Sequence, residues 1–67
     1  MQYAPGDRVV LPATGECGVV VHAWDDNGTQ DCYVAFFGTR FPASGEKLEQ
    51  KPYILRYYAT SLAAAKP

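Results

Sequence analysis

The feature that most constrains the fold is the Asn27-Gly28 pair, which separates two apolar runs. The first run, residues 17–24, contains three consecutive valines, and β-branched residues favour extended backbone over helix. The second run, residues 31–38, is rich in aromatic and β-branched residues. Asparagine and glycine tolerate the positive φ angles that a tight turn requires. The pattern predicts an antiparallel hairpin, with a connection that reaches as far as Gln30.

Three further segments complete the expected architecture. Residues 8–11 follow the Gly6-Asp7 turn signal and stop at Pro12, which cannot donate a hydrogen bond to a strand ladder. Residues 53–58 form another aromatic and β-branched run, followed by one helical turn over 59–61 and a short closing strand over 62–64. The stretch 39–52 has no clear period and is expected to be a long loop. The chain therefore predicts an all-β, antiparallel, five-stranded small barrel forming one domain over residues 1–67.

Composition excludes several classes of protein. The chain has 67 residues, of which 48% are apolar and 19% charged, so it is expected to fold around one small core rather than remain disordered. Its formal net charge is -1, too little positive charge to bind nucleic acid by electrostatics alone. No apolar run is long enough to span a membrane, and the first residues lack the order of a signal peptide. We expect a cytoplasmic protein with no membrane partner.

The residues that commonly carry catalysis or bind metals form no recognisable motif. Cys17 and Cys32 are the two cysteines and His22 is the single histidine, and their spacing matches no zinc-binding pattern. His22 has no nucleophile motif nearby, and packing against Trp24 explains it adequately. No glycine-rich phosphate loop is present. The sequence therefore predicts a non-catalytic protein with no metal and no cofactor.

Short motifs along residues 5–64 resemble the layout of SH3-like small barrels. The motifs are Gly6-Asp7-Arg8-Val9, Gly18-Val19-Val20, residues 33–38 (YVAFFG) and residues 57–62 (YYATSL). Tudor, KOW and CarD-type modules share the opening pattern and the following glycine-valine pattern. The resemblance implies an SH3-like barrel, with Val34 and Phe36 pointing inward, and a protein-binding or transcription-associated role.

The plasmid type II dihydrofolate reductases are also similar, since they share the Gly-Asp-Arg-Val opening and a related ending. Their active pore uses a Val-Gln-Ile-Tyr segment, and the matching stretch here is Ile54-Leu55-Arg56-Tyr57. Only the tyrosine is retained, and Leu55 stands where the glutamine would bind cofactor and substrate. An oligomeric reductase is thus kept only as an alternative function.

The number of large apolar side chains points to a binding surface. The chain has 20 of them, whereas a barrel of this size encloses roughly ten to twelve. The Val19-Val20-Val21 and Ile54-Leu55 runs place apolar groups on both faces of their strands, a pattern typical of strands buried on both sides. A contiguous surplus marks a surface for a protein partner or for a second copy in a homo-oligomer. The expected surface residues are Trp24, Tyr33, Phe37, Phe41, Leu55, Tyr57 and Tyr58.

Two other binding modes are compatible with the sequence. Trp24 beside Asp25 and Asp26 has the chemistry of an aromatic cage for a cationic side chain. Arg8, Arg40 and Arg56 lie on or near predicted strands, and arginines beside tyrosines can bind single-stranded nucleic acid. The isoelectric point of about 5.6 lacks the usual basic signature of such proteins. Nucleic-acid binding is therefore the alternative to a protein-binding function.

Overall fold

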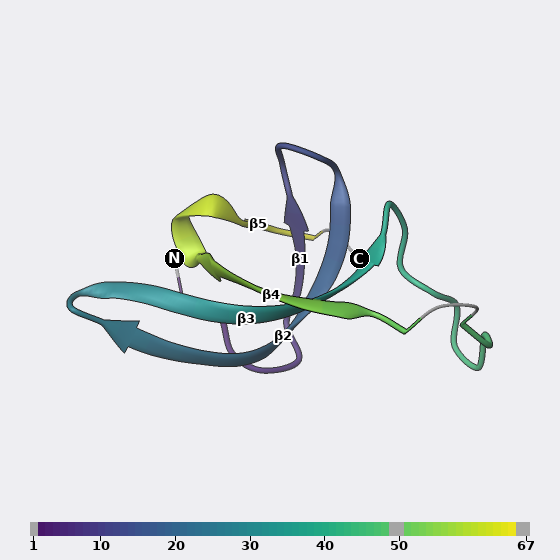
Figure 1. Ribbon diagram of the computed structural model, residues 1–67, viewed down its shortest axis with the longest axis horizontal. Helices are drawn as coiled ribbons and strands as arrows, with labels where there is room; N and C mark the ends of the chain where they lie inside the picture. The colour runs from purple at the N-terminus through teal and green to yellow at the C-terminus, as the bar shows by residue number, and fades with distance from the viewer. Residues whose placement is uncertain (1, 49–50, 66–67) are drawn as a thin grey trace.

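A computed structural model describes residues 2–48 and 51–65 (Figure 1). The strands are β1 (Arg8–Leu11), β2 (Glu16–Asp26), β3 (Thr29–Gly38), β4 (Tyr53–Tyr58) and β5 (Ala63–Ala64). One 3-10 turn, η1 (Ala59–Ser61), precedes the last strand. The expectation of an all-β, five-stranded antiparallel protein with a short helical turn before its last strand is confirmed. No helix within the described ranges is long and apolar enough to cross a membrane.

The five strands form one sheet in the order β4-β3-β2-β1-β5. Every neighbouring pair is antiparallel. Register shifts interrupt the β2–β3 pairing between Cys17 and Gly18 and between Val20 and His22, and such irregularities bend a strand. In Figure 1, β1 runs across the direction of the long β2–β3 hairpin. The bend lets one small sheet enclose a core while β4 and β5 remain at its two ends.

The buried core is built from β1, β2 and β3, together with Tyr3, Ala59 and Leu62. Val34 and Phe36 on β3 are fully buried, whereas Tyr33 between Cys32 and Val34 is exposed, so the period-two assignment of faces is confirmed. The other buried members of the core are Tyr3, Val9, Leu11, Val20, Cys32, Ala59 and Leu62. Tyr3 is held in place by Gln30, whose amide exchanges two hydrogen bonds of 2.8 Å with the Tyr3 backbone.

The hairpin turn is tighter than expected. Asn27 has a φ of 56° and Gly28 a φ of 87°, the two positive angles of a two-residue hairpin connection. Asp26 pairs with Thr29 and Asp25 with Gln30, so the expected extension of the connection to Gln30 is wrong. Aspartate has a low propensity for strands. Here the backbone hydrogen bonds of the hairpin, formed next to the Asn-Gly turn, outweigh that low propensity.

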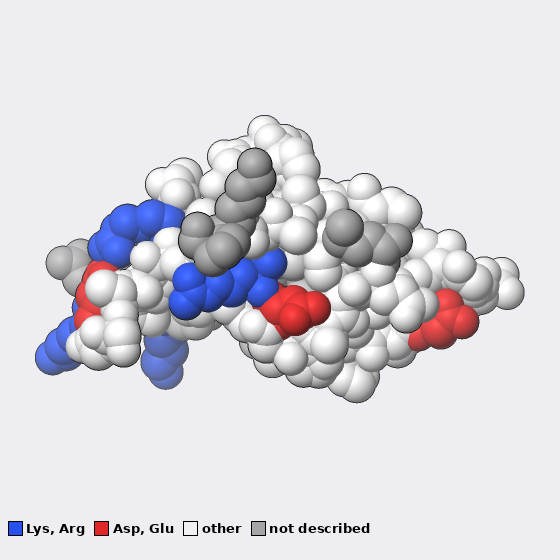
Figure 2. Space-filling view, turned by 180° about the vertical axis from the view of Figure 1, so that it is seen from behind, with Lys and Arg blue, Asp and Glu red and all other residues white. Residues whose placement is uncertain are grey.

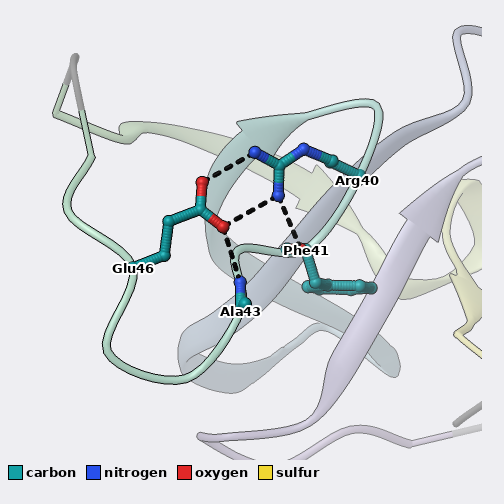
Figure 3. A network of polar contacts seen from close by, with 4 residues as sticks. All are labelled: Arg40, Phe41, Ala43 and Glu46. Carbon is teal, nitrogen blue, oxygen red and sulfur yellow. Dashed lines mark hydrogen bonds and ion pairs between the residues drawn. The ribbon is translucent and has the colours of Figure 1, made fainter.

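The segment between β3 and β4 contains no helix or strand among its described residues, 39–48 and 51–52; Glu49 and Gln50 lie outside them. The glutamate at its centre organises this loop (Figure 3). Glu46 accepts hydrogen bonds from Arg40 Nη1 at 3.0 Å and Nη2 at 2.6 Å, and from the Ala43 backbone N–H at 2.9 Å. The same Arg40 donates to the Phe41 carbonyl at 3.4 Å. The loop is therefore closed on itself by one ion pair.

Candidate functional site

Strand β4 lies at one edge of the sheet and exposes an unusual amount of apolar surface. It pairs with β3 alone, and five of its six residues are exposed. Tyr53 is 46% exposed, Ile54 56%, Leu55 43% and Tyr58 47%. An edge strand also presents backbone N–H and C=O groups that have no partner strand. We call the outward side of Tyr53–Tyr58 the β4 edge.

One face of β4 continues the core toward solvent. Tyr53, Leu55 and Tyr57 lie opposite the buried residues of β3, namely Phe36, Val34 and Cys32. Tyr57 is half-buried and meets the Phe36 ring edge-on at 5.8 Å between centroids. Tyr53 also contacts the Phe36 ring, at 5.8 Å, and its hydroxyl donates a hydrogen bond to the Glu16 carboxylate. Leu55 is 43% exposed, so this face of β4 adds partly exposed apolar side chains beside the buried core.

The opposite face of β4 is anchored by an ion pair between Arg56 and Asp31. Asp31 is only 1% exposed. Its Oδ2 accepts a hydrogen bond from Arg56 Nε at 2.6 Å and lies 2.5 Å from Arg56 Nη2 in the ion pair. Its Oδ1 accepts the Cys32 backbone N–H at 3.0 Å. The hydrogen bond with Asp31 is the main reason that the pKa of Arg56 is raised above its usual value. Asp26 lies 3.6 Å from the same guanidinium, so the charge of Arg56 is compensated within the chain.

Beside this ion pair, three rings from β2 and β3 pack on one another. The Trp24 ring lies 5.7 Å from His22 and 5.1 Å from Tyr33, measured between ring centroids. The packing of His22 against Trp24 is confirmed. The guanidinium of Arg56 lies 5.6 Å from the centre of the Trp24 ring. A cation of the chain itself therefore already occupies a place beside Trp24, which weighs against an aromatic cage for an external cation.

The three arginines considered for nucleic-acid binding each have a partner in the structure. Arg8 lies over the Phe41 ring at 4.7 Å, Arg40 is paired with Glu46, and Arg56 with Asp31. On the face seen in Figure 2, basic side chains gather toward the end with the long loop, while acidic ones lie at the hairpin end, near the middle and among the basic ones. Two of the three arginines are thus paired with carboxylates, and Arg8 lies against an aromatic ring.

Two open depressions flank the β4 edge at its ends. The first, of about 290 Å³, lies at the Tyr58 end and is lined by Asp31, Arg56, Tyr57, Tyr58 and Ser61. The second, of about 140 Å³, lies at the Tyr53 end and is lined by Phe36, Phe37, Gly38, Leu48, Lys51, Pro52 and Tyr53. The exposed side chains of β4 thus have a depression of the surface at each end of the strand.

The structure brings together some of the expected partner-binding residues and separates others. Leu55 and Tyr58 are exposed on β4, and Tyr33, 43% exposed, lies on the adjacent strand opposite Arg56. The remaining expected residues, Trp24, Phe37, Phe41 and Tyr57, are half-buried. Trp24 and Tyr57 pack within the fold as described, and Phe37 borders a small pocket of about 70 Å³ under the loop.

Tyr53 and Ile54 were missed as surface residues. Both belong to the apolar Tyr53–Tyr58 run, and alternation along that run puts Ile54 on the face away from the core. The sequence feature that could indicate their exposure is the presence of apolar residues on both faces of a strand that follows a long loop. That signal also fits a strand buried on both sides, so it could not identify an edge.

The cysteines and acidic residues form neither a disulfide nor a metal site in the described structure. Cys17 lies opposite Gly38 and Cys32 opposite Ala23, which separates them by roughly 20 Å along the sheet. That distance is too long for a disulfide, and both cysteines are free and buried. Within residues 2–48 and 51–65, no group of three or more His, Cys, Asp or Glu side chains is placed to hold a metal ion.

Comparisons with protein-family models, curated proteins and solved structures give no match to this chain. Its class is therefore defined by the fold and the site alone. It is a small all-β protein with one bent antiparallel sheet, and the β4 edge is its largest concentration of exposed apolar side chains within the described residues.

Proposed function

We propose that the protein is a non-catalytic, SH3-like interaction module that binds an extended apolar protein segment along the β4 edge. The segment adds as a further strand: its backbone bonds to the outward groups of β4, and its side chains cover the exposed ones. Strand addition to an open edge is a recurrent mode of protein recognition, in which backbone bonds give affinity and alternate side chains give specificity.

The observation that carries this proposal is the exposure of both faces of β4. Ile54 and Tyr58 are exposed on one face and Tyr53 and Leu55 on the other. A partner strand laid beside β4 would cover part of each face. Four large side chains left about half exposed to water are an energetic liability in a free domain, and their burial in a complex would account for them.

The β4 edge also lacks the features that protect edge strands from pairing. Such strands commonly carry lysines, a proline or a bulge. Tyr53–Tyr58 contains no lysine and no proline, and its pairing with β3 is regular from end to end. Its one charge, on Arg56, is turned onto Asp31. Nothing in the strand opposes the approach of another chain.

The alternatives have less support. Nucleic-acid binding needs several free cations, and two of the three candidates, Arg40 and Arg56, are paired with carboxylates of the chain itself. A reductase similar to the type II dihydrofolate reductases needs a polar group where Leu55 stands.

The experiment is a binding titration with a fluorescent peptide of sequence Tyr53–Tyr58, flanked by lysines for solubility. We expect saturable binding to the protein, weakened about tenfold by Ile54→Lys or Leu55→Lys because a charge then faces the apolar segment. Circular dichroism verifies that the variants fold. Val21→Lys is the matched control, because Val21 is 48% exposed on a strand that does not adjoin β4. Absence of saturable binding, or equal binding by all variants, contradicts the proposal.

A further inference from the structure

We infer that the segment bound at the β4 edge is β4 of a second copy of this chain, paired antiparallel about a twofold axis at Leu55. This inference rests on the proposed function and identifies its partner. The dimer has one continuous sheet across the two copies, with the two β4 strands side by side at its centre.

The first constraint on such a dimer is the pleat of the sheet. In an antiparallel pair, residues directly opposite each other lie on the same face. When the twofold axis is perpendicular to the sheet, the core-side face of one copy continues the core-side face of the other. The axis must then pass through a residue rather than between two, because a shift by one position would place core-side residues against solvent-side ones.

The second constraint is the identity of the residue on the axis. An axis at Arg56 places Arg56 directly opposite Arg56 of the second copy, and like charges in that position are destabilising. An axis at Ile54 limits the ladder to residues 53–55, because Arg56 then faces Pro52, which has no N–H to donate. An axis at Tyr57 draws in Ala59, which belongs to η1 rather than to the strand.

An axis at Leu55 keeps the two arginines apart and allows a ladder over residues 53–57, with Tyr58 facing Pro52 just beyond it. It sets Leu55 opposite its own copy, Tyr53 opposite Tyr57, and Ile54 opposite the aliphatic stem of Arg56. Aromatic and aliphatic pairs of this kind stabilise neighbouring strands. All five paired positions lie within the strand Tyr53–Tyr58. The sequence of β4 is therefore self-complementary in one register.

The ion pair at Arg56 lowers the cost of covering this strand with a second copy, because the charge of Arg56 is already compensated. Bringing a second copy against β4 removes water from the solvent-side face, and an isolated charge there would oppose association. Arg56 already bonds Asp31 through two nitrogens and lies near Asp26. The charge is compensated before association, and no new ion pair has to form across the axis.

The test combines sedimentation equilibrium with disulfide trapping. We expect the protein to dimerise reversibly, with a dissociation constant raised about tenfold by Ile54→Lys because the twofold axis repeats each unfavourable contact. Under mild oxidation, Leu55→Cys should form a covalent dimer, since residues on the axis have Cα atoms within disulfide range. Ile54→Cys is the matched control: two copies of Ile54 are offset by two positions along the sheet, about 8 Å apart, too far to bridge.

Wild-type protein under the same oxidation controls for Cys17 and Cys32, which are buried. A protein that stays monomeric at millimolar concentration while still binding the Tyr53–Tyr58 peptide overturns the second-copy inference and leaves the proposed function intact. Efficient trapping through Ile54→Cys, or a dimer that neither cysteine traps, overturns the register. Loss of peptide binding and of dimerisation together overturns both proposals.

Discussion

Arg56 and Asp31 form an ion pair whose two partners differ sharply in exposure. The side chain of Asp31 is 1% exposed and that of Arg56 53%. The carboxylate is thus enclosed by the sheet, and the guanidinium covers it from the solvent side. This arrangement holds the side chain of Arg56 away from the free edge of β4. The single charged residue of the proposed binding strand is therefore also the counterion of a buried carboxylate.

Removing the arginine should expose the dependence of the fold on this pair. We expect Arg56→Leu to lower the Tm, because Asp31 then keeps a buried charge without its counterion. Adding Asp31→Asn to that variant should recover part of the loss, since a neutral amide is less costly to bury than a carboxylate. Thermal unfolding at neutral pH measures both. An unchanged Tm in Arg56→Leu would show that the pair does not support the fold.

Gly18 offers a test of the core. A Cβ at this position would lie 2.5 Å from Val34 Cγ1 and 3.0 Å from both the Ala35 carbonyl oxygen and Phe36 Cδ1. We expect Gly18→Ala to reduce the free energy of unfolding by about 1–3 kcal/mol, as overpacked cores do. Urea denaturation gives the value.

Val34 supplies the control for the Gly18 variant. In a Val34→Ala background the closest clashing atom is gone, so the additional cost of Gly18→Ala should be smaller. Equal costs in the two backgrounds would contradict the close approach of Gly18 to Val34.

The ion pair in the long loop predicts a pH dependence. Hydrogen bonds from Arg40, and then from the Ala43 backbone, lower the pKa of Glu46 from 4.5 to about 2. The folded loop thus favours the charged carboxylate. Its contribution to stability is complete above pH 4.5 and is lost as the pH falls through about 2.

Carboxyl NMR titration measures this directly. We expect Glu46 to titrate with a midpoint near pH 2 in the native protein. Arg40→Gln should move the midpoint upward toward 4.5, because the largest cause of the shift is removed. A wild-type midpoint at the ordinary value would show that the loop does not hold this contact in solution.

Local patterns in the sequence predicted most of the fold. The Asn27-Gly28 turn, the alternation of Tyr33 and Val34, and the single turn before the last strand depend on interactions between neighbours in the chain. The sequence predicts a shorter hairpin, because aspartates such as Asp25 and Asp26 have a low strand propensity. In the structure they pair with Gln30 and Thr29, an effect of the partner strand that propensity does not contain.

The candidate site could be predicted only in part. The surplus of large apolar residues correctly indicated exposed apolar surface, and Leu55 and Tyr58 were placed on it. The apolar residues on both faces of Ile54-Leu55 suggested a strand buried on both sides, yet both are exposed. Burial of such a strand depends on which elements lie beside it. That is a property of the sheet order, and the residues of β4 do not encode it.

The most direct measurement of the central claim is amide hydrogen exchange along β4. In dilute protein, amides directed toward β3 should be protected and alternate amides directed outward should exchange rapidly, as at an open edge. With saturating Tyr53–Tyr58 peptide, we predict that the outward amides of β4 also become protected, while protection elsewhere changes little. Bound peptide that leaves the outward amides of β4 unprotected would contradict the assignment of this edge as the binding surface.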